Sequence, residues 1–185
     1  MGIKKVLNCI ILVMIIITAV VATAEKISLT GTVAVIGNEP FTKLIFSANN
    51  NQKYLLDKNE LWQELFKLQG ANLRIEGFIS NSNDPIFKTP KLEVSDYEIL
   101  WIGEGENRQT PWVGTININD NLVYLQTSKQ KSYQIIGPNV EIFKNYPNAK
   151  VWVTGTQKKQ WFKKNNQIYV TAYCIIKEAP PTTSN

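Results

Sequence analysis

The strongest constraint on the fold of this chain is that its second half repeats the pattern of its first half. In both halves, runs rich in Val, Ile, Thr and Tyr alternate with turns of Gly, Asn and Pro, which is typical of β-strands. The runs occur in the same order, and the matched residues are Gly31 with Gly114, Tyr54 with Tyr133, Gly77 with Gly155, Val94 with Val170, and Tyr97 with Tyr173. Agreement at this many positions predicts two copies of one small β-rich domain.

Each copy contains one segment whose hydrophobic period changes from two residues to that of a helix. In residues 57–69, apolar side chains fall on one helical face, with Asn59 as the expected cap and Gly70 as the stop. Residues 140–146 occupy the same place in the second copy. We expect strands at residues 27–37, 42–48, 53–57, 71–80 and 91–100, and again at 112–118, 121–127, 132–136, 150–155 and 168–176.

Three strands, a helix and two further strands, with a glycine in strands one and four, resemble the OB-fold. That fold is a five-stranded, partly open Greek-key barrel, and glycines suit strands that bend sharply. The sequence therefore predicts a mostly β protein of two tandem five-stranded OB-fold-like Greek-key barrels, each with a short helix between strands 3 and 4. The alternative is a single β-sandwich with a helical insertion. The resemblance covers nearly all of the chain after residue 24 and implies no catalytic motif.

The first 24 residues have the pattern of a signal peptide. Lys4 and Lys5 precede an apolar run, and Ala22-Thr23-Ala24 places small residues before a cleavage site at Ala24–Glu25. We expect export, to the periplasm or outside the cell; an uncleaved N-terminal anchor is the alternative. The expected organisation is a signal peptide at 1–24, OB-like domains at 25–102 and 112–178, a linker at 103–111 and a disordered tail at 179–185.

The two halves differ in charge. Residues 25–107 hold 8 basic and 12 acidic side chains, whereas residues 108–185 hold 10 basic and 3 acidic ones. A basic half indicates an anionic partner. The basic and aromatic residues are concentrated in the loop between the last two strands of the second copy, which contains Lys158, Lys159, Trp161, Phe162, Lys163 and Lys164.

Comparison of the copies also identifies aromatic side chains that should point outward. Strand alternation assigns Arg74 and Glu93 of the first copy to the solvent side, and the residues that match them are Trp152 and Tyr169. We therefore predict a ligand-binding surface of Trp152, Tyr169 and the basic aromatic loop. Two alternatives stay open: these aromatics pack against the other domain, or Trp161 and Phe162 fold back as a lid on the barrel.

The sequence offers little for catalysis. It has no histidine, and cleavage of the leader would leave Cys174 as the one cysteine of the two it starts with. The commonest general base and zinc ligand is therefore missing, and no carboxylate pair or phosphate-binding loop stands out. We predict a non-catalytic protein without cofactor or metal.

The composition favours a binding module in which lysines attract an anionic group and aromatic rings stack on bases or sugars. The expected partners are an anionic polymer, either nucleic acid or glycan, or an anionic lipid headgroup at a membrane surface. The alternative is a protein of the cell envelope that uses the same hairpin as a docking surface for another protein.

Overall fold

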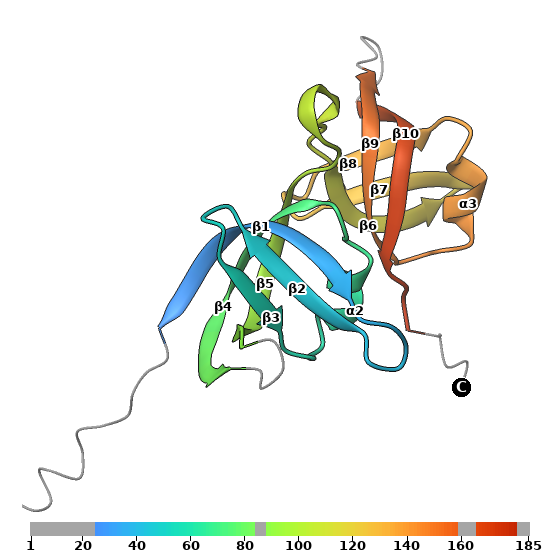
Figure 1. The fold of residues 1–185 in the computed structure, drawn as a ribbon. Helices are drawn as coiled ribbons and strands as arrows, with labels where there is room; N and C mark the ends of the chain where they lie inside the picture. Colours follow the sequence, from blue (N-terminus) through green and yellow to red (C-terminus); the bar gives the residue numbers. More distant parts are fainter. Residues whose placement is uncertain (1–24, 84–87, 159–165, 181–185) are drawn as a thin grey trace, which may run out of the picture.

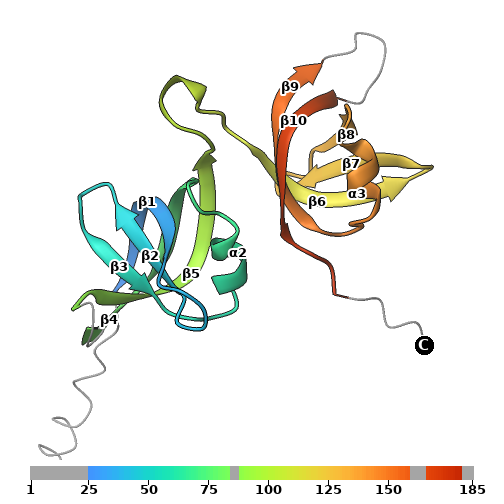
Figure 2. The same ribbon diagram turned by 45° about the vertical axis from the view of Figure 1, so that its right-hand side comes forward.

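The computed structural model describes residues 25–83, 88–158 and 166–180, and of residues 81–83 the backbone alone. Within these residues the strands close into two five-stranded barrels that lie side by side (Figures 1 and 2). The predicted signal peptide at residues 1–24 lies outside the described residues, as do residues 181–185 of the predicted tail.

The first barrel contains β1 (Lys26–Ile36), β2 (Lys43–Ala48), β3 (Lys53–Leu56), α2 (Trp62–Phe66), β4 (Asn72–Asn83) and β5 (Pro90–Trp101). The second contains β6 (Trp112–Asn119), β7 (Leu122–Thr127), β8 (Ser132–Ile136), α3 (Val140–Lys144), β9 (Lys150–Lys158) and β10 (Asn166–Lys177). A 3-10 turn, η1 (Gly105–Asn107), lies in the connection between them.

Both barrels have the same strand order. The first runs β1-β2-β3-β5-β4 and closes through pairing of β4 with β1; the second pairs β6, β7, β8, β10 and β9 in the same way. Only the pairing of the third strand with the fifth is parallel among the described strands. With a helix between strands 3 and 4, this is the OB-fold topology. The predicted fold class is confirmed, and the alternative of a single sandwich is wrong.

Alternation along the strands fills the two cores as the sequence predicts. Leu73 and Ile75 on β4 and their equivalents Val151 and Val153 on β9 are all buried. So are the matched residues of the fifth strands: Leu92, Val94, Ile168 and Val170. Each barrel therefore has its own hydrophobic cluster, which burial of these side chains stabilises.

The repeat extends to the irregular part of the fourth and fifth strands. A β-bulge interrupts the pairing of β4 with β5 at Ser95, and an equivalent bulge interrupts that of β9 with β10 at Thr171. The Ser95 hydroxyl donates to the carbonyl of Glu76, and the Thr171 hydroxyl donates to the carbonyl of Thr154. Both acceptors immediately precede the matched glycines, so the fourth and fifth strands of the two copies bend through the same bulge and the same hydrogen bond.

Those glycines are required by a close approach of two backbones. A Cβ atom at Gly155 would lie 2.0 Å from the carbonyl oxygen of Tyr169, and one at Gly77 would lie 2.2 Å from that of Glu93. Backbone atoms of a closed barrel cannot move aside as a flexible side chain can. The structure thus gives the physical reason for the glycine that the sequence pattern repeats in the fourth strand.

The first helix is shorter than the segment with helical periodicity. α2 spans five residues, and the bonds Lys67 N–Glu64 O, Leu68 N–Leu65 O and Ala71 N–Leu68 O that follow it close tighter, three-residue turns. Gly70, at φ +77°, reverses the chain into β4. At the other end the cap position is Leu61, which makes no side-chain capping bond, so the prediction of Asn59 as the cap is wrong. Asn59 lies two residues earlier and accepts a hydrogen bond from the Leu61 amide at 3.0 Å in the turn before the helix.

The second barrel completes the core of the first. Ile176, near the end of β10, is 1% exposed and belongs to the first barrel's hydrophobic cluster, against which Val113 and Trp152 also pack. The Cys174 thiol lies 3.9 Å from the carbonyl oxygen of Lys67, just after α2. Burial of Ile176 alone is worth about 2 kcal/mol. The two barrels therefore share a packed junction, which places α2 against the end of β10 (Figure 2).

We expect Gly155→Ala to lower the free energy of unfolding by about 3 kcal/mol, because the new methyl group would overlap a backbone carbonyl. Gly105→Ala is the matched control: Gly105 has a positive φ of 57°, but a Cβ there would meet no atom within 4 Å. It should cost about 1 kcal/mol through backbone strain alone. Urea unfolding of both variants measures the difference. Equal losses would contradict the close approach.

Candidate functional site

The outer surface of β7, β8 and β10 carries a group of apolar side chains, two of them exposed and one half-buried. Tyr169 on β10 pairs with Ile136, the last residue of β8. Leu122 begins β7, and the antiparallel register that pairs Tyr124 with Gln134 brings Leu122 beside Ile136. Leu122 is 44% exposed and Tyr169 is 38% exposed. We call Leu122, Ile136 and Tyr169 the outer patch.

A lysine lies at the edge of the outer patch. The Lys158 ammonium is 5.1 Å from the centroid of the Tyr169 ring, within the range of a cation–π contact. Lys158 is exposed and has no carboxylate partner among the described residues. Gly137, which follows β8, also lies near the ring, since a Cβ there would be 3.5 Å from it. Tyr169 thus lies near both a cation and the Gly137 backbone and is still 38% exposed.

Next to the outer patch, polar side chains form a row across all five strands of the barrel. The pairings place Lys158, Gln167, Gln134, Tyr124 and Asn117 side by side, in that order. Gln167 is 8% exposed and donates to the Gln134 side-chain oxygen at 2.8 Å. This hydrogen bond joins β8 to β10 two residues before the Tyr169–Ile136 pair, and it stiffens the surface on which the outer patch lies.

The first barrel has charged residues where the second has the outer patch. Gly31 pairs with Ala48 in the first barrel, and the matched Gly114 pairs with Thr127 in the second. Counting back from these pairs, Lys43 of the first barrel is equivalent to Leu122 of the second. By the same registers Asp57 corresponds to Ile136, and Glu93 to Tyr169. The first barrel adopts the same fold with charged residues at these positions. The fold therefore does not require the apolar side chains that the second barrel has there.

The structure brings together only part of the binding surface predicted from the sequence. Lys158 and Tyr169 are in contact, as described above. Trp152 also points away from the second core, but it lies four residues before Thr156, the partner of Tyr169 on β9. It packs against the first barrel's hydrophobic cluster, which agrees with the alternative that this side chain packs against the other domain. The other predicted residues lie outside the described residues: Lys159, Trp161, Phe162, Lys163 and Lys164.

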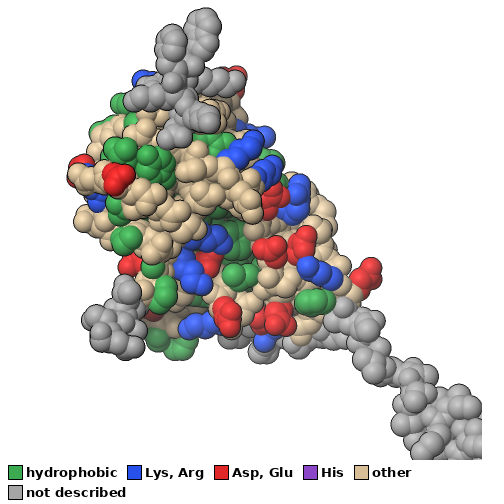
Figure 3. Space-filling model, turned by 180° about the vertical axis from the view of Figure 1, so that it is seen from behind, with side chains coloured by type: hydrophobic (Ala, Val, Ile, Leu, Met, Phe, Trp, Pro, Cys, Tyr) green, Lys and Arg blue, Asp and Glu red, His purple; other side chains and the backbone are tan. Residues whose placement is uncertain are grey.

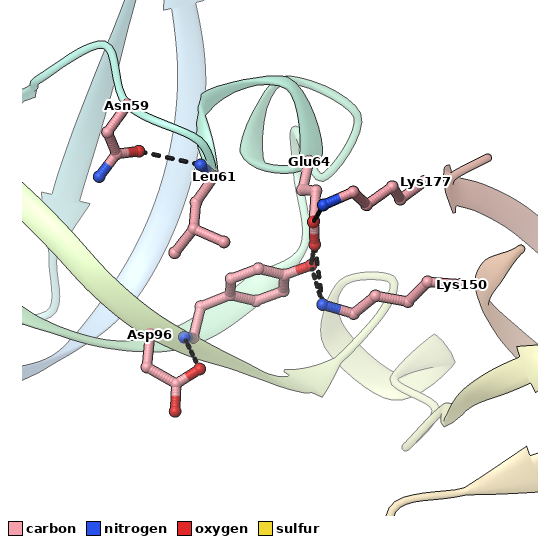
Figure 4. Close-up of polar contacts among 7 residues, drawn as sticks. Asn59, Leu61, Glu64, Asp96, Lys150 and Lys177 are labelled. Carbon is pink, nitrogen blue, oxygen red and sulfur yellow. Dashed lines mark hydrogen bonds and ion pairs between the residues drawn. The ribbon is translucent and has the colours of Figure 1, made fainter. Parts of the chain in front are cut away.

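A buried carboxylate that the sequence did not predict lies between the barrels. Glu64 on α2 is 4% exposed. Tyr97 donates to Glu64 Oε2 at 2.6 Å, and the Lys150 ammonium donates to the same oxygen at 2.8 Å (Figure 4). Lys177 lies 3.4 Å from Glu64 Oε1. Both lysines come from the second barrel, so the two barrels are joined through a charge that neither could bury alone.

The hydrogen bonds determine the protonation of this junction. Burial on its own would raise the pKa of Glu64, but the bonds from Lys150 and Tyr97 outweigh it, and the pKa lies below its ordinary value. Burial, with Glu64 as the second cause, raises the pKa of Tyr97 far above its ordinary value, so the phenol keeps its proton and donates. Burial likewise raises the pKa of the Cys174 thiol, which stays protonated near neutral pH.

A sequence signal for Glu64 exists in the helical period. Glu64 lies three residues after Leu61 and four before Leu68, both of which belong to the apolar face of the predicted helix. A carboxylate at such a position must be buried or at the edge of the core. The corresponding residue of the second barrel is Ile142, one before the buried Phe143, and it is 37% exposed.

Two further properties of the described residues bear on function. They contain no group of three or more Cys, Asp or Glu side chains placed to hold a metal ion. None of their helices has the length and apolar character needed to cross a bilayer.

Comparisons with known proteins return structural neighbours alone. No protein-family model and no curated protein sequence matches the chain. Among solved structures it is similar to the single-stranded DNA-binding protein from Thermus aquaticus, at 12% identity and a TM-score of 0.28, over 86% of this chain and 96% of that one. A deletion mutant of the same protein matches at 12% identity and a TM-score of 0.28, over 86% and 97% of the two chains.

We expect Glu64→Gln to lower the free energy of unfolding by about 2 kcal/mol at pH 7, because the lysines lose a buried counter-charge. Since the folded state lowers the pKa of Glu64, the carboxylate stabilises above the unfolded pKa of about 4.3, and this stabilisation is lost as the pH falls through the folded value. Urea unfolding at pH 7 and at about pH 3 should show a penalty that shrinks in acid.

Glu141→Gln is the control for this measurement. Glu141 pairs with Lys144 at 2.8 Å, but its side chain is 77% exposed, so its loss should cost less than about 0.5 kcal/mol at either pH. A Glu64→Gln penalty of the same size at both pH values would contradict the lowered pKa.

Proposed function

We propose that this protein is an exported, non-catalytic binding protein whose second barrel holds an anionic, ring-bearing polymer on the outer patch. The observation that carries the proposal is a difference in residue type between the two barrels at three equivalent positions. Three charged residues of the first barrel, Lys43, Asp57 and Glu93, stand where the second has Leu122, Ile136 and Tyr169. The second barrel therefore offers one ring and two aliphatic side chains to a partner at positions where the first has charged side chains.

The chemistry of the patch suits a ligand with alternating rings and anionic groups. The Tyr169 ring offers a face to a base or a sugar, and Lys158 beside it offers an ammonium to a phosphate, sulfate or carboxylate. The row of Gln134, Tyr124 and Asn117 adds amide and hydroxyl groups that can bond to polar edges of such rings.

In the sequence, further groups of the same kind follow Lys158 directly. The segment from Lys159 to Lys164, which contains Trp161 and Phe162, connects Lys158 to β10 in the chain. Together with Lys158, this segment has four lysines and two aromatic rings. This composition supports a polyanion partner rather than a neutral one. Nucleic acid and anionic glycan both satisfy this chemistry, and export would bring either within reach.

The runner-up function is docking of an envelope protein on the same surface. It is favoured by Leu122 and Ile136, which are aliphatic and would suit an apolar partner better than a stack of rings. Salt separates the two functions: binding of a polyanion weakens steeply as ionic strength rises, whereas an apolar docking surface responds much less.

Tyr169→Ala should weaken binding of a single-stranded oligonucleotide or an anionic glycan about tenfold, because it removes one stacking ring. Glu93→Ala, at the equivalent position of the first barrel, is the matched control and should leave affinity unchanged. Tryptophan fluorescence titrations of the chain without residues 1–24, at low and at physiological salt, measure both. Absence of binding by the unsubstituted protein at low salt would refute the polyanion function.

The loop is tested separately by changing Trp161 and Phe162 together to Ala. If the polymer lies across the outer patch and the loop, this variant and Tyr169→Ala should both lose affinity. Loss in the loop variant alone would move the site away from the outer patch. Binding that is insensitive to salt would favour protein docking instead.

A further inference from the structure

A second candidate site lies at the opposite end of β7 and β8, in a cleft of about 460 Å³ between the two barrels. Both barrels and their connection contribute to it. β5 supplies Tyr97 and Ile99, the connection and β6 supply Pro111 and Trp112, and the turn between β7 and β8 supplies Lys129 and Lys131. We call this space the inter-barrel cleft. Viewed from behind, charged side chains gather along the boundary between the barrels, where the surface is hollowed (Figure 3).

The turn that carries two of the lysines is fixed by hydrogen bonds. The Thr127 amide donates to the Lys131 carbonyl at 2.9 Å, and the Gln130 amide donates to the Thr127 carbonyl at 2.9 Å. Gln130 adopts the left-handed conformation, at φ 55°, that closes such a turn. Lys129 and Lys131 are exposed and have no carboxylate partner among the described residues. Their charges are therefore held at the cleft without being neutralised.

A third lysine reaches the cleft from β9 with part of its bonding capacity unused. Lys150 lines the cleft and donates to Glu64 Oε2 at 2.8 Å and to the Tyr97 hydroxyl at 2.9 Å. An ammonium group has three N–H donors, so one remains for a ligand. Among the described residues that line the cleft, the one carboxylate is that of Glu98, which Arg74 binds at 2.6 Å. The local charge balance is positive.

The remaining walls are apolar or aromatic. Ile99 is 6% exposed, and Trp112, Val113 and Pro111 continue the same wall. A hydrated inorganic ion would leave this surface unused, whereas an anion with a ring or an aliphatic part would cover it. The cleft has the volume of a small-molecule site and combines an apolar wall with convergent cations.

The first barrel shows that the cations are not required by the turn. Its corresponding turn has the same two hydrogen bonds, from Ala48 N to Gln52 O and from Asn51 N to Ala48 O, both at 2.9 Å. Asn50 and Gln52 stand there in place of Lys129 and Lys131. The same backbone thus forms with neutral residues, and the lysines of the second barrel serve something other than the turn.

We propose that the inter-barrel cleft binds a compact organic anion: a phosphate, sulfate or carboxylate group held by Lys129, Lys131 and Lys150, with a ring or aliphatic part against Trp112 and Ile99. This site is separate from the outer patch, which lies about 17 Å away along the five-residue rise of β7. It does not depend on the function proposed for that patch.

Phenyl phosphate is the probe, because it carries one anionic group and one ring. The unsubstituted chain without residues 1–24 should bind it in isothermal titration calorimetry at low salt, more tightly than it binds inorganic phosphate or phenol. Lys129→Asn combined with Lys131→Gln copies the first barrel's turn and should weaken binding about tenfold, through loss of two charge-assisted bonds.

A charge-matched variant tests whether position matters. Adding Asn50→Lys and Gln52→Lys to the double variant restores the net charge on the equivalent turn of the first barrel. Binding should stay weak. Recovery of affinity would overturn the proposal in favour of a general effect of net charge. No binding of phenyl phosphate by the unsubstituted protein, or full affinity in the Lys129→Asn, Lys131→Gln variant, would also overturn it.

Discussion

The arrangement of the two barrels depends on one buried carboxylate. Glu64 is almost inaccessible to water, so its charge must be compensated by hydrogen bonds and nearby cations. Among the described residues the cations within 4 Å of it are Lys150 and Lys177, and both belong to the second barrel. The helix that carries Glu64 also closes the first core. A first barrel on its own would therefore expose the apolar surface that Ile176 covers and leave Glu64 without its two cations, which couples the folding of the two copies.

The two copies share their backbone and differ in their surfaces. The bulge residues Ser95 and Thr171 make the same hydrogen bond, and the glycines that follow their acceptors meet the same steric limit. These features close the barrel and leave its outer positions free to vary. The second copy uses that freedom twice, for the outer patch at one end of β7 and β8 and for the lysines of the turn at the other.

Local pattern was sufficient for the fold, because alternation and glycine spacing are local properties of a strand. It could not reveal the junction. Glu64 and Lys150 are 86 residues apart, and no periodicity links them. Comparison of the copies placed Trp152 and Tyr169 on the outer side correctly, yet only the packing of the barrels shows that the first is covered and the second is not. What covers an outward residue is a property of the tertiary structure alone.

β10 connects the outer patch to the junction, and its bulges make this possible. Before the bulge at Thr171, the side chains of Ile168 and Val170 point into the second core and Tyr169 points out. The bulge shifts the alternation by one residue, so that Tyr173 and Ile175 pack on the second core. Ile176 then faces the first barrel instead of its own, and Lys177 reaches Glu64. Because one extra residue re-aims the whole end of the strand, a single strand presents Tyr169 to solvent and fixes the neighbouring barrel.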